Sequence, residues 1–90
     1  MEISAQSIEQ ALLRLPRLPT PVSEWRVRTG PDSTDDPAVW VRAVLSHDDV
    51  DADTRHLLRR MIRERVREEA GTHVLVYVRF PTASEIEQAR

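Results

Sequence analysis

The sequence predicts an α+β fold in which two helices cover one face of a three-stranded mixed sheet, a two-layer sandwich. Three patterns lead to this prediction: an amphipathic helical stripe in residues 51–71, an alternating apolar strand directly after it, and a turn-rich segment between two earlier alternating stretches. The expected order is α-β-β-α-β. Because 90 residues suffice for one modest core, residues 1–90 are expected to form a single domain.

Residues 1–15 are expected to form the first helix, which has apolar residues at every third or fourth position. Ser4 or Ser7 can cap its N-terminus, because a short hydroxyl side chain accepts hydrogen bonds from the first unpaired amides. Pro16 disfavours helical geometry in the residue before it, so the helix should end just before this proline. Residues 16–21 are then predicted to be a stiff, proline-rich connector.

Residues 22–45 are predicted to form a hairpin of two strands joined by a turn-rich loop. In the first strand, Trp25 and Val27 should face the core, and the charged residues between them should face solvent. The core-facing residues of the second strand are expected to be Val39, Val41, Ala43 and Leu45.

Residues 51–71 carry an apolar stripe along one side and arginines along the other, which predicts a long amphipathic helix. Asp51 or Asp53 can cap its start, and Gly71 stands where a helix commonly ends. Residues 72–80 are predicted to be the third strand, ended by Pro81. Its core-facing residues are expected to be Val74, Val76, Val78 and Phe80.

Residues 81–90 are expected to be a tail. In it Ser84 and Glu87 resemble a capping box, so we expect a short C-terminal helix there.

The long helix connects the second and third strands, so these two strands should be parallel through a right-handed crossover. We expect the third strand to lie beside the first and antiparallel to it, as in a split βαβ arrangement. The element order is similar to that of cation-diffusion transporter cytoplasmic domains, secretion-system ring-building domains and the KH RNA-binding fold. The resemblance covers topology alone, since Gly30 and Gly71 are the only glycines and no GXXG loop of the KH type exists.

Composition excludes several classes of function. There is no cysteine, which removes disulfides and zinc–cysteine sites, and the net charge of −2 does not point to nucleic acid. No stretch is long and apolar enough for a membrane span, and no secretory leader is recognisable, so we expect a soluble, cytoplasmic protein without cofactor. All basic residues are arginine, which reflects either the coding bias of a GC-rich bacterial genome or a need for planar, bidentate contacts; we expect a small bacterial protein.

The entry into the long helix is rich in potential metal ligands, and the candidates are His47, Asp49, Asp51 and His56. The aspartate spacing resembles a calcium loop, but Thr54 stands where that loop needs glycine and Arg60 where it needs glutamate. A capped helix entry is therefore favoured over a metal site or a metal-dependent enzyme. The hairpin loop, with Asp32, Asp35 and Asp36, is likewise interpreted as a turn rather than an acid–base site.

The sheet face opposite the helices is predicted to carry aromatic and aliphatic residues surrounded by arginines: Arg26, Arg28, Trp40, Arg42, Val44, Leu75, Tyr77 and Arg79. Such patches mark interfaces, and tryptophan, tyrosine and arginine are enriched in binding hot spots. We interpret the face as a protein–protein surface, in a homodimer or with the partner of an accessory or antitoxin-like protein. Its anchors would be Trp40, Tyr77, Arg42 and Arg79, with Arg26 and Arg28 as the rim.

Two alternatives remain for this face: it binds single-stranded RNA, or Trp40 lies under the C-terminal tail as ordinary core. The arginines on the exposed side of the long helix are a further charged surface. They can meet an acidic partner or the aspartate-rich loops of a second copy of the chain.

Overall fold

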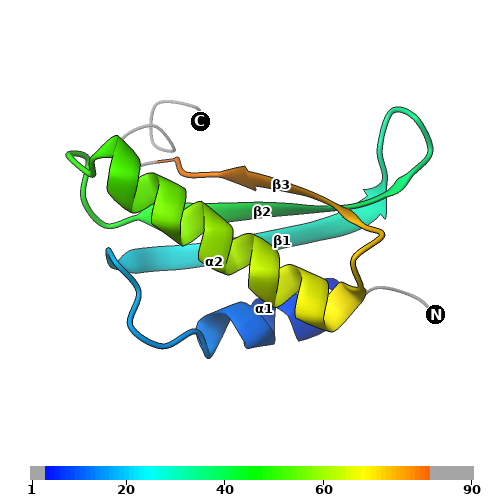
Figure 1. Ribbon diagram of the computed structural model, residues 1–90, viewed down its shortest axis with the longest axis horizontal. Coiled ribbons are helices and arrows are strands. Elements are labelled where there is room, and N and C mark those ends of the chain that lie inside the picture. Colours follow the sequence, from blue (N-terminus) through cyan, green and yellow to red (C-terminus); the bar gives the residue numbers. More distant parts are fainter. Residues whose placement is uncertain (1–3, 82–90) are drawn as a thin grey trace.

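The computed structural model describes residues 4–81, which form two helices and a three-stranded mixed sheet. The elements in chain order are α1 (Ala5–Leu13), β1 (Val22–Pro31), β2 (Pro37–Leu45), α2 (Ala52–Ala70) and β3 (Leu75–Arg79). Both helices lie on one side of the sheet (Figure 1). The predicted fold class and element order are confirmed, whereas the short C-terminal helix expected around Ser84 lies outside the described residues.

The order of strands in the sheet differs from the expected one. β2 is the central strand, antiparallel to β1 and parallel to β3, so the expectation that β3 lies beside β1 was wrong. The parallel orientation of β2 and β3 is as expected from the crossover. The physical reason for the order is the layer of helices: α1 packs against β1, and α2 packs against β3. Because α1 occupies the β1 side of this layer, the chain that leaves α2 returns to β2, the strand that precedes α2, and pairs with it as β3.

Helix α2 begins and ends at residues that suit those positions. The Asp51 side chain accepts a hydrogen bond of 3.0 Å from the amide of Thr54, which confirms the predicted cap. Gly71 follows the last helical residue with φ of 98°, a conformation that side chains with a Cβ rarely adopt. A Cβ at this position would also lie 2.9 Å from the ring of His73. The hydrogen bonds to Thr54 lower the pKa of the Asp51 carboxyl group, so the charged form caps the helix at neutral pH.

Helix α1 begins at the Ser4 cap, whose side chain accepts from the Ser7 amide, and it ends at Leu13, two residues before the expected boundary at Leu15. Its inward residues join those of the sheet and α2 in one core. The buried members of this core are Ile8, Leu12, Trp25, Val39, Val41, Ala43, Leu45, Leu58, Ile62, Val66, Val74 and Val76. Among the described residues, no helix is long and apolar enough to cross a membrane.

Two adjacent leucines of α2 allow the contribution of this core to be measured with a matched control. Leu58 is fully buried, whereas Leu57 is 46% exposed. Leu58→Ala should lower the free energy of unfolding by about 2–5 kcal/mol, because it removes apolar contacts and leaves a cavity. Leu57→Ala makes the same chemical change at the surface and should cost under about 1 kcal/mol.

Urea denaturation followed by circular dichroism measures both changes. Equal losses for the two variants would contradict the packing described for α2.

Candidate functional site

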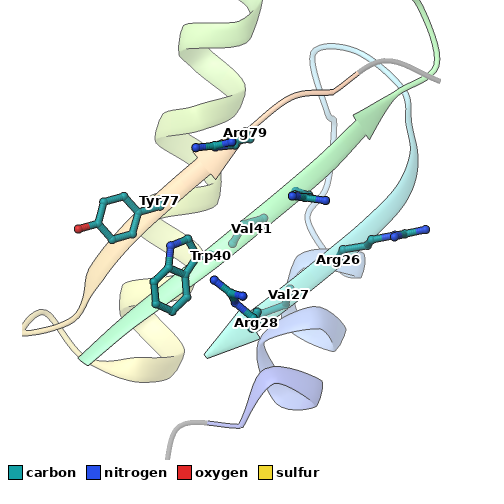
Figure 2. Close-up of a pocket in the computed structure, with 8 residues that line it drawn as sticks. Arg26, Val27, Arg28, Trp40, Val41, Tyr77 and Arg79 are labelled. Atoms are coloured by element: carbon teal, nitrogen blue, oxygen red, sulfur yellow. The ribbon is translucent and has the colours of Figure 1, made fainter. Parts of the chain in front are cut away.

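The outer face of the sheet, opposite the helices, brings most of the predicted interaction residues together. The alternation of each strand turns Arg26 and Arg28 of β1, Trp40 and Arg42 of β2, and Leu75, Tyr77 and Arg79 of β3 to this side. A hollow of about 400 Å³ opens on the face (Figure 2). Its lining residues are Arg26, Val27, Arg28, Trp40, Val41, Arg42, Tyr77 and Arg79.

The strand register arranges these side chains in two rows that cross the sheet. In the first row, Trp40 of β2 is paired with Arg28 on one side and Tyr77 on the other. The Trp40 and Tyr77 rings are nearly parallel, at 15°, with centroids 5.8 Å apart. The Arg28 Cζ lies over the Trp40 ring, 4.6 Å from its centroid. Trp40 therefore lies between a cation and a second ring, an arrangement that favours both contacts.

A hydrogen bond continues the first row to the turn between β1 and β2. The Tyr77 hydroxyl donates to Asp32 Oδ2 at 3.2 Å. Asp32 Oδ1 also accepts from the Thr34 amide and hydroxyl, and these bonds hold the pKa of the Asp32 carboxyl group below its ordinary value. Desolvation and the nearby Asp32 carboxylate raise the pKa of Tyr77. Sequence reasoning missed Asp32 as part of this face, because the two residues are 45 positions apart.

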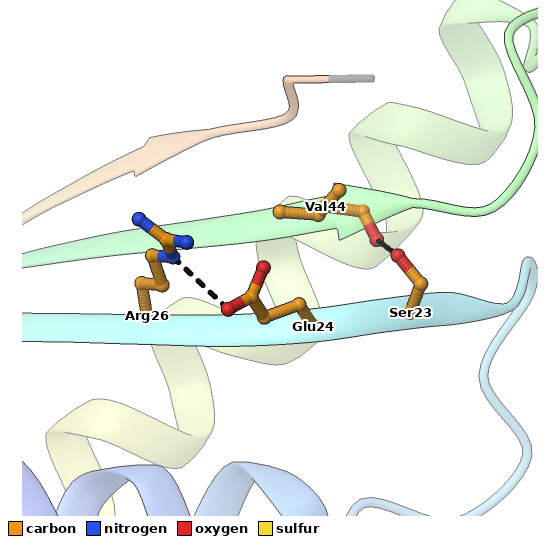
Figure 3. A network of polar contacts seen from close by, with 4 residues as sticks. All are labelled: Ser23, Glu24, Arg26 and Val44. Carbon is orange, nitrogen blue, oxygen red and sulfur yellow. Dashed lines mark hydrogen bonds and ion pairs between the residues drawn. The ribbon is translucent and has the colours of Figure 1, made fainter. Parts of the chain in front are cut away.

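The second row consists of three arginines, one from each strand. Arg42 of β2 is paired with Arg26 of β1 and with Arg79 of β3. Arg26 Nε donates to Glu24 Oε1 of the same strand at 3.1 Å (Figure 3). Within residues 4–81, no ion pair joins Arg42 or Arg79 to a carboxylate. Like charges on directly opposed residues repel one another, so this row is electrostatically unfavourable in the isolated chain.

Val44 is the one predicted interaction residue that offers almost no surface, since only 3% of it is exposed. Near it, a bulge shifts the register of β1 between Val22 and Glu24. The extra residue is Ser23, whose hydroxyl donates to the Val44 carbonyl at 3.1 Å (Figure 3). The bulge turns Val22 toward the core without changing the outward direction of Glu24. Because Val44 is almost fully buried, it is removed from the candidate contact residues.

The potential metal ligands at the start of α2 do not form a site. Asp51 caps the helix, and His47, Asp49 and His56 are exposed. Within the described part of the chain, no three side chains of the histidine, cysteine, aspartate or glutamate types are placed to hold a metal ion.

Helix α2 carries a second basic surface on the side away from the sheet. A hollow of about 250 Å³ there is lined by His56, Arg59, Arg60, Arg63, Glu64 and Arg67. Unlike the outer face of the sheet, this lining contains no tryptophan, tyrosine or aliphatic residue. The Arg59 Cζ lies 5.1 Å from the centroid of the Phe80 ring, so part of this charge is already engaged.

Comparison of the chain with protein-family models, with curated proteins and with solved structures gave no match.

The Tyr77–Asp32 bond can be tested by titration, because Tyr77 is the only tyrosine in the chain. Its absorbance should titrate at a pKa above the usual value of about 10, since the neutral phenol donates to a carboxylate and a phenolate would be repelled by it. Asp32→Asn removes the negative charge and should lower the Tyr77 pKa toward its usual value.

Asp35→Asn, in the same turn, is the control and should leave the Tyr77 pKa unchanged. The stabilisation from this bond should be complete below the usual tyrosine pKa and be lost as the pH rises through the raised one. A wild-type midpoint that does not respond to Asp32→Asn would contradict the bond.

Proposed function

We propose that this chain is a non-enzymatic binding module whose outer sheet face recognises an acidic segment of another protein. The observation that carries the proposal is the row Arg26, Arg42 and Arg79 beside the Trp40–Tyr77 stack. It combines positive charge with apolar ring surface in one hollow. Interfaces concentrate their binding energy in residues of these types.

The electrostatics of the arginine row favour a ligand with carboxylates. A guanidinium group presents parallel N–H donors that match the two oxygens of a carboxylate. A partner carboxylate between Arg42 and Arg79 would relieve their mutual repulsion and gain charge-assisted hydrogen bonds. The electrostatic energy of the arginine row is thus less favourable in the free chain than with an acidic group bound.

The same charges argue against self-association through this face. In a two-fold dimer the same patch lies on both sides of the interface, so a patch rich in arginines would face its own copy. The face carries four arginines in its hollow, and the ion pair found for them in the described structure is that of Arg26 with Glu24. Juxtaposed like charges oppose association, so we favour a different protein over the predicted homodimer.

Single-stranded RNA is the second candidate, because tryptophan and tyrosine beside arginines can stack bases and neutralise phosphates. A base needs an open ring face for stacking. Trp40 already has Arg28 over its ring and Tyr77 beside it, which leaves less of the ring available. The arrangement of the first row therefore favours a protein partner.

Acid–base catalysis has little support in this hollow. Its lining consists of arginines, valines, one tryptophan and one tyrosine. Arginine remains protonated in proteins, and the raised pKa of Tyr77 keeps its phenol neutral at physiological pH.

Selection from a displayed random-peptide library tests the proposal directly. We expect the wild-type protein to enrich acidic peptides, and Arg42→Glu to weaken their binding at least about tenfold, as expected for a hot-spot arginine. Arg63→Glu on α2 changes the net charge by the same amount and should leave the affinity nearly unchanged. Isothermal calorimetry with the selected peptides measures both effects.

A single-stranded oligouridine is titrated in parallel. Oligouridine binding that depends on Arg42, without enrichment of acidic peptides, would replace the protein partner by RNA.

The absence of self-association through this face is a separate prediction. Light scattering should give a monomeric mass for the wild type at both low and high salt, because the outer faces repel each other. A dimer that dissociates on Trp40→Ala would show instead that the face binds a second copy.

A further inference from the structure

The two free edges of the sheet differ in how they are protected. Since β2 is central, β1 and β3 each have one edge that pairs with no strand in residues 4–81. Edge strands expose unpaired amides and carbonyls, and proteins commonly protect them with charged side chains or a covering element. A helix packs against each edge strand, α1 on β1 and α2 on β3, so the helices do not distinguish the two edges. On β1 the residues that face outward beside the free edge include Glu24, Arg26 and Arg28.

Among the described residues, strand β3 has fewer charged side chains beside its free edge than β1. Its two outward residues nearest the start, Leu75 and Tyr77, are large and each 42% exposed. Arg79 is the charged residue of the strand, and within the described structure it has no acidic partner. An apolar, exposed edge strand favours pairing with another chain.

We infer that the partner binds by strand addition, with an extended acidic segment pairing along β3 as a fourth strand of the sheet. This inference rests on the proposed function and specifies how the partner binds. Backbone hydrogen bonds to the free edge of β3 would supply much of the affinity, and the side chains beside the edge would supply the specificity. The occupant we propose is a segment of another protein, because carboxylates on an acidic strand would complement Arg79 and the adjoining arginine row.

The spacing of β3 predicts the chemistry of that segment. Alternate residues of the added strand would lie beside Leu75, Tyr77 and Arg79, about 7 Å from one to the next along the strand. The position beside Leu75 favours an aliphatic residue, and the position beside Arg79 favours aspartate or glutamate. The expected recognition pattern is therefore an apolar residue and an acidic residue with three residues between them. The second of these three would contact the Tyr77 ring.

Alternate N-methylation of the selected acidic peptides tests strand addition. In an added strand, every second amide faces β3 and the others face away. Two versions of each peptide are synthesised, one methylated at the odd and one at the even amides of the binding segment. One version should lose binding to the wild-type protein, and the other should retain it. Retention by both versions, or loss by both, would overturn strand addition.

A pair of matched substitutions tests whether β3 is the edge that binds. Leu75→Glu places a charge beside the edge and should weaken the peptides at least about tenfold. Leu57→Glu makes the same change on α2 at a leucine that is 46% exposed, and it should leave the affinity unchanged. Circular dichroism shows whether both variants fold. If Leu75→Glu does not fold, the methylated peptides still decide the question with the wild-type protein.

The experiments distinguish failure of strand addition from failure of the proposed function. Peptides that require Arg42 but tolerate Leu75→Glu and both methylation patterns would keep the outer face as the binding surface and remove strand addition. Failure to enrich acidic peptides would remove the proposed function, and strand addition with it.

Discussion

The central strand β2 holds the outer face in position, because it is paired on both edges and alternates between the two sides of the sheet. Its inward residues Val39 and Val41 are buried beneath the helices. A slip of β2 by one residue would expose them, so the packing of the core specifies the register. Trp40 and Arg42 are thereby held outward. Each supplies the middle of one row, and the arrangement of the outer face is thus a direct consequence of core packing.

Periodicity in the sequence is sufficient to predict which side chains share a face of a strand, and Trp40, Arg42 and Tyr77 lie where the alternation places them. It contains no information about which strands are neighbours, which is why the position expected for β3 was wrong. The two rows depend on that order and could not be predicted. The contribution of Asp32 was also missed, because it depends on where a turn meets a strand much later in the chain.

The outer face departs from the arrangement that would make the isolated chain most stable. Opposite charges across neighbouring strands would be more favourable than the row of Arg26, Arg42 and Arg79. Elsewhere in the chain, local preferences and packing agree, as at the Asp51 cap and at Gly71. Departures of this kind are concentrated at functional sites, where a favourable contact is completed only by the ligand. The row therefore supports the proposal that this face binds an acidic partner.

The Tyr77–Asp32 hydrogen bond has a consequence for how the molecule opens. It joins β3 to the turn between β1 and β2, in addition to the backbone pairing that joins β3 to β2. β3 is the shortest strand and, within residues 4–81, has a strand neighbour on one side only, so local unfolding should begin there. Opening β3 must break the Tyr77–Asp32 bond, whereas Asp32 keeps its bonds from Thr34 within the turn. A strand docked on β3 would hold Tyr77 in place and would thereby restrain Asp32, in a turn that the docked strand does not touch.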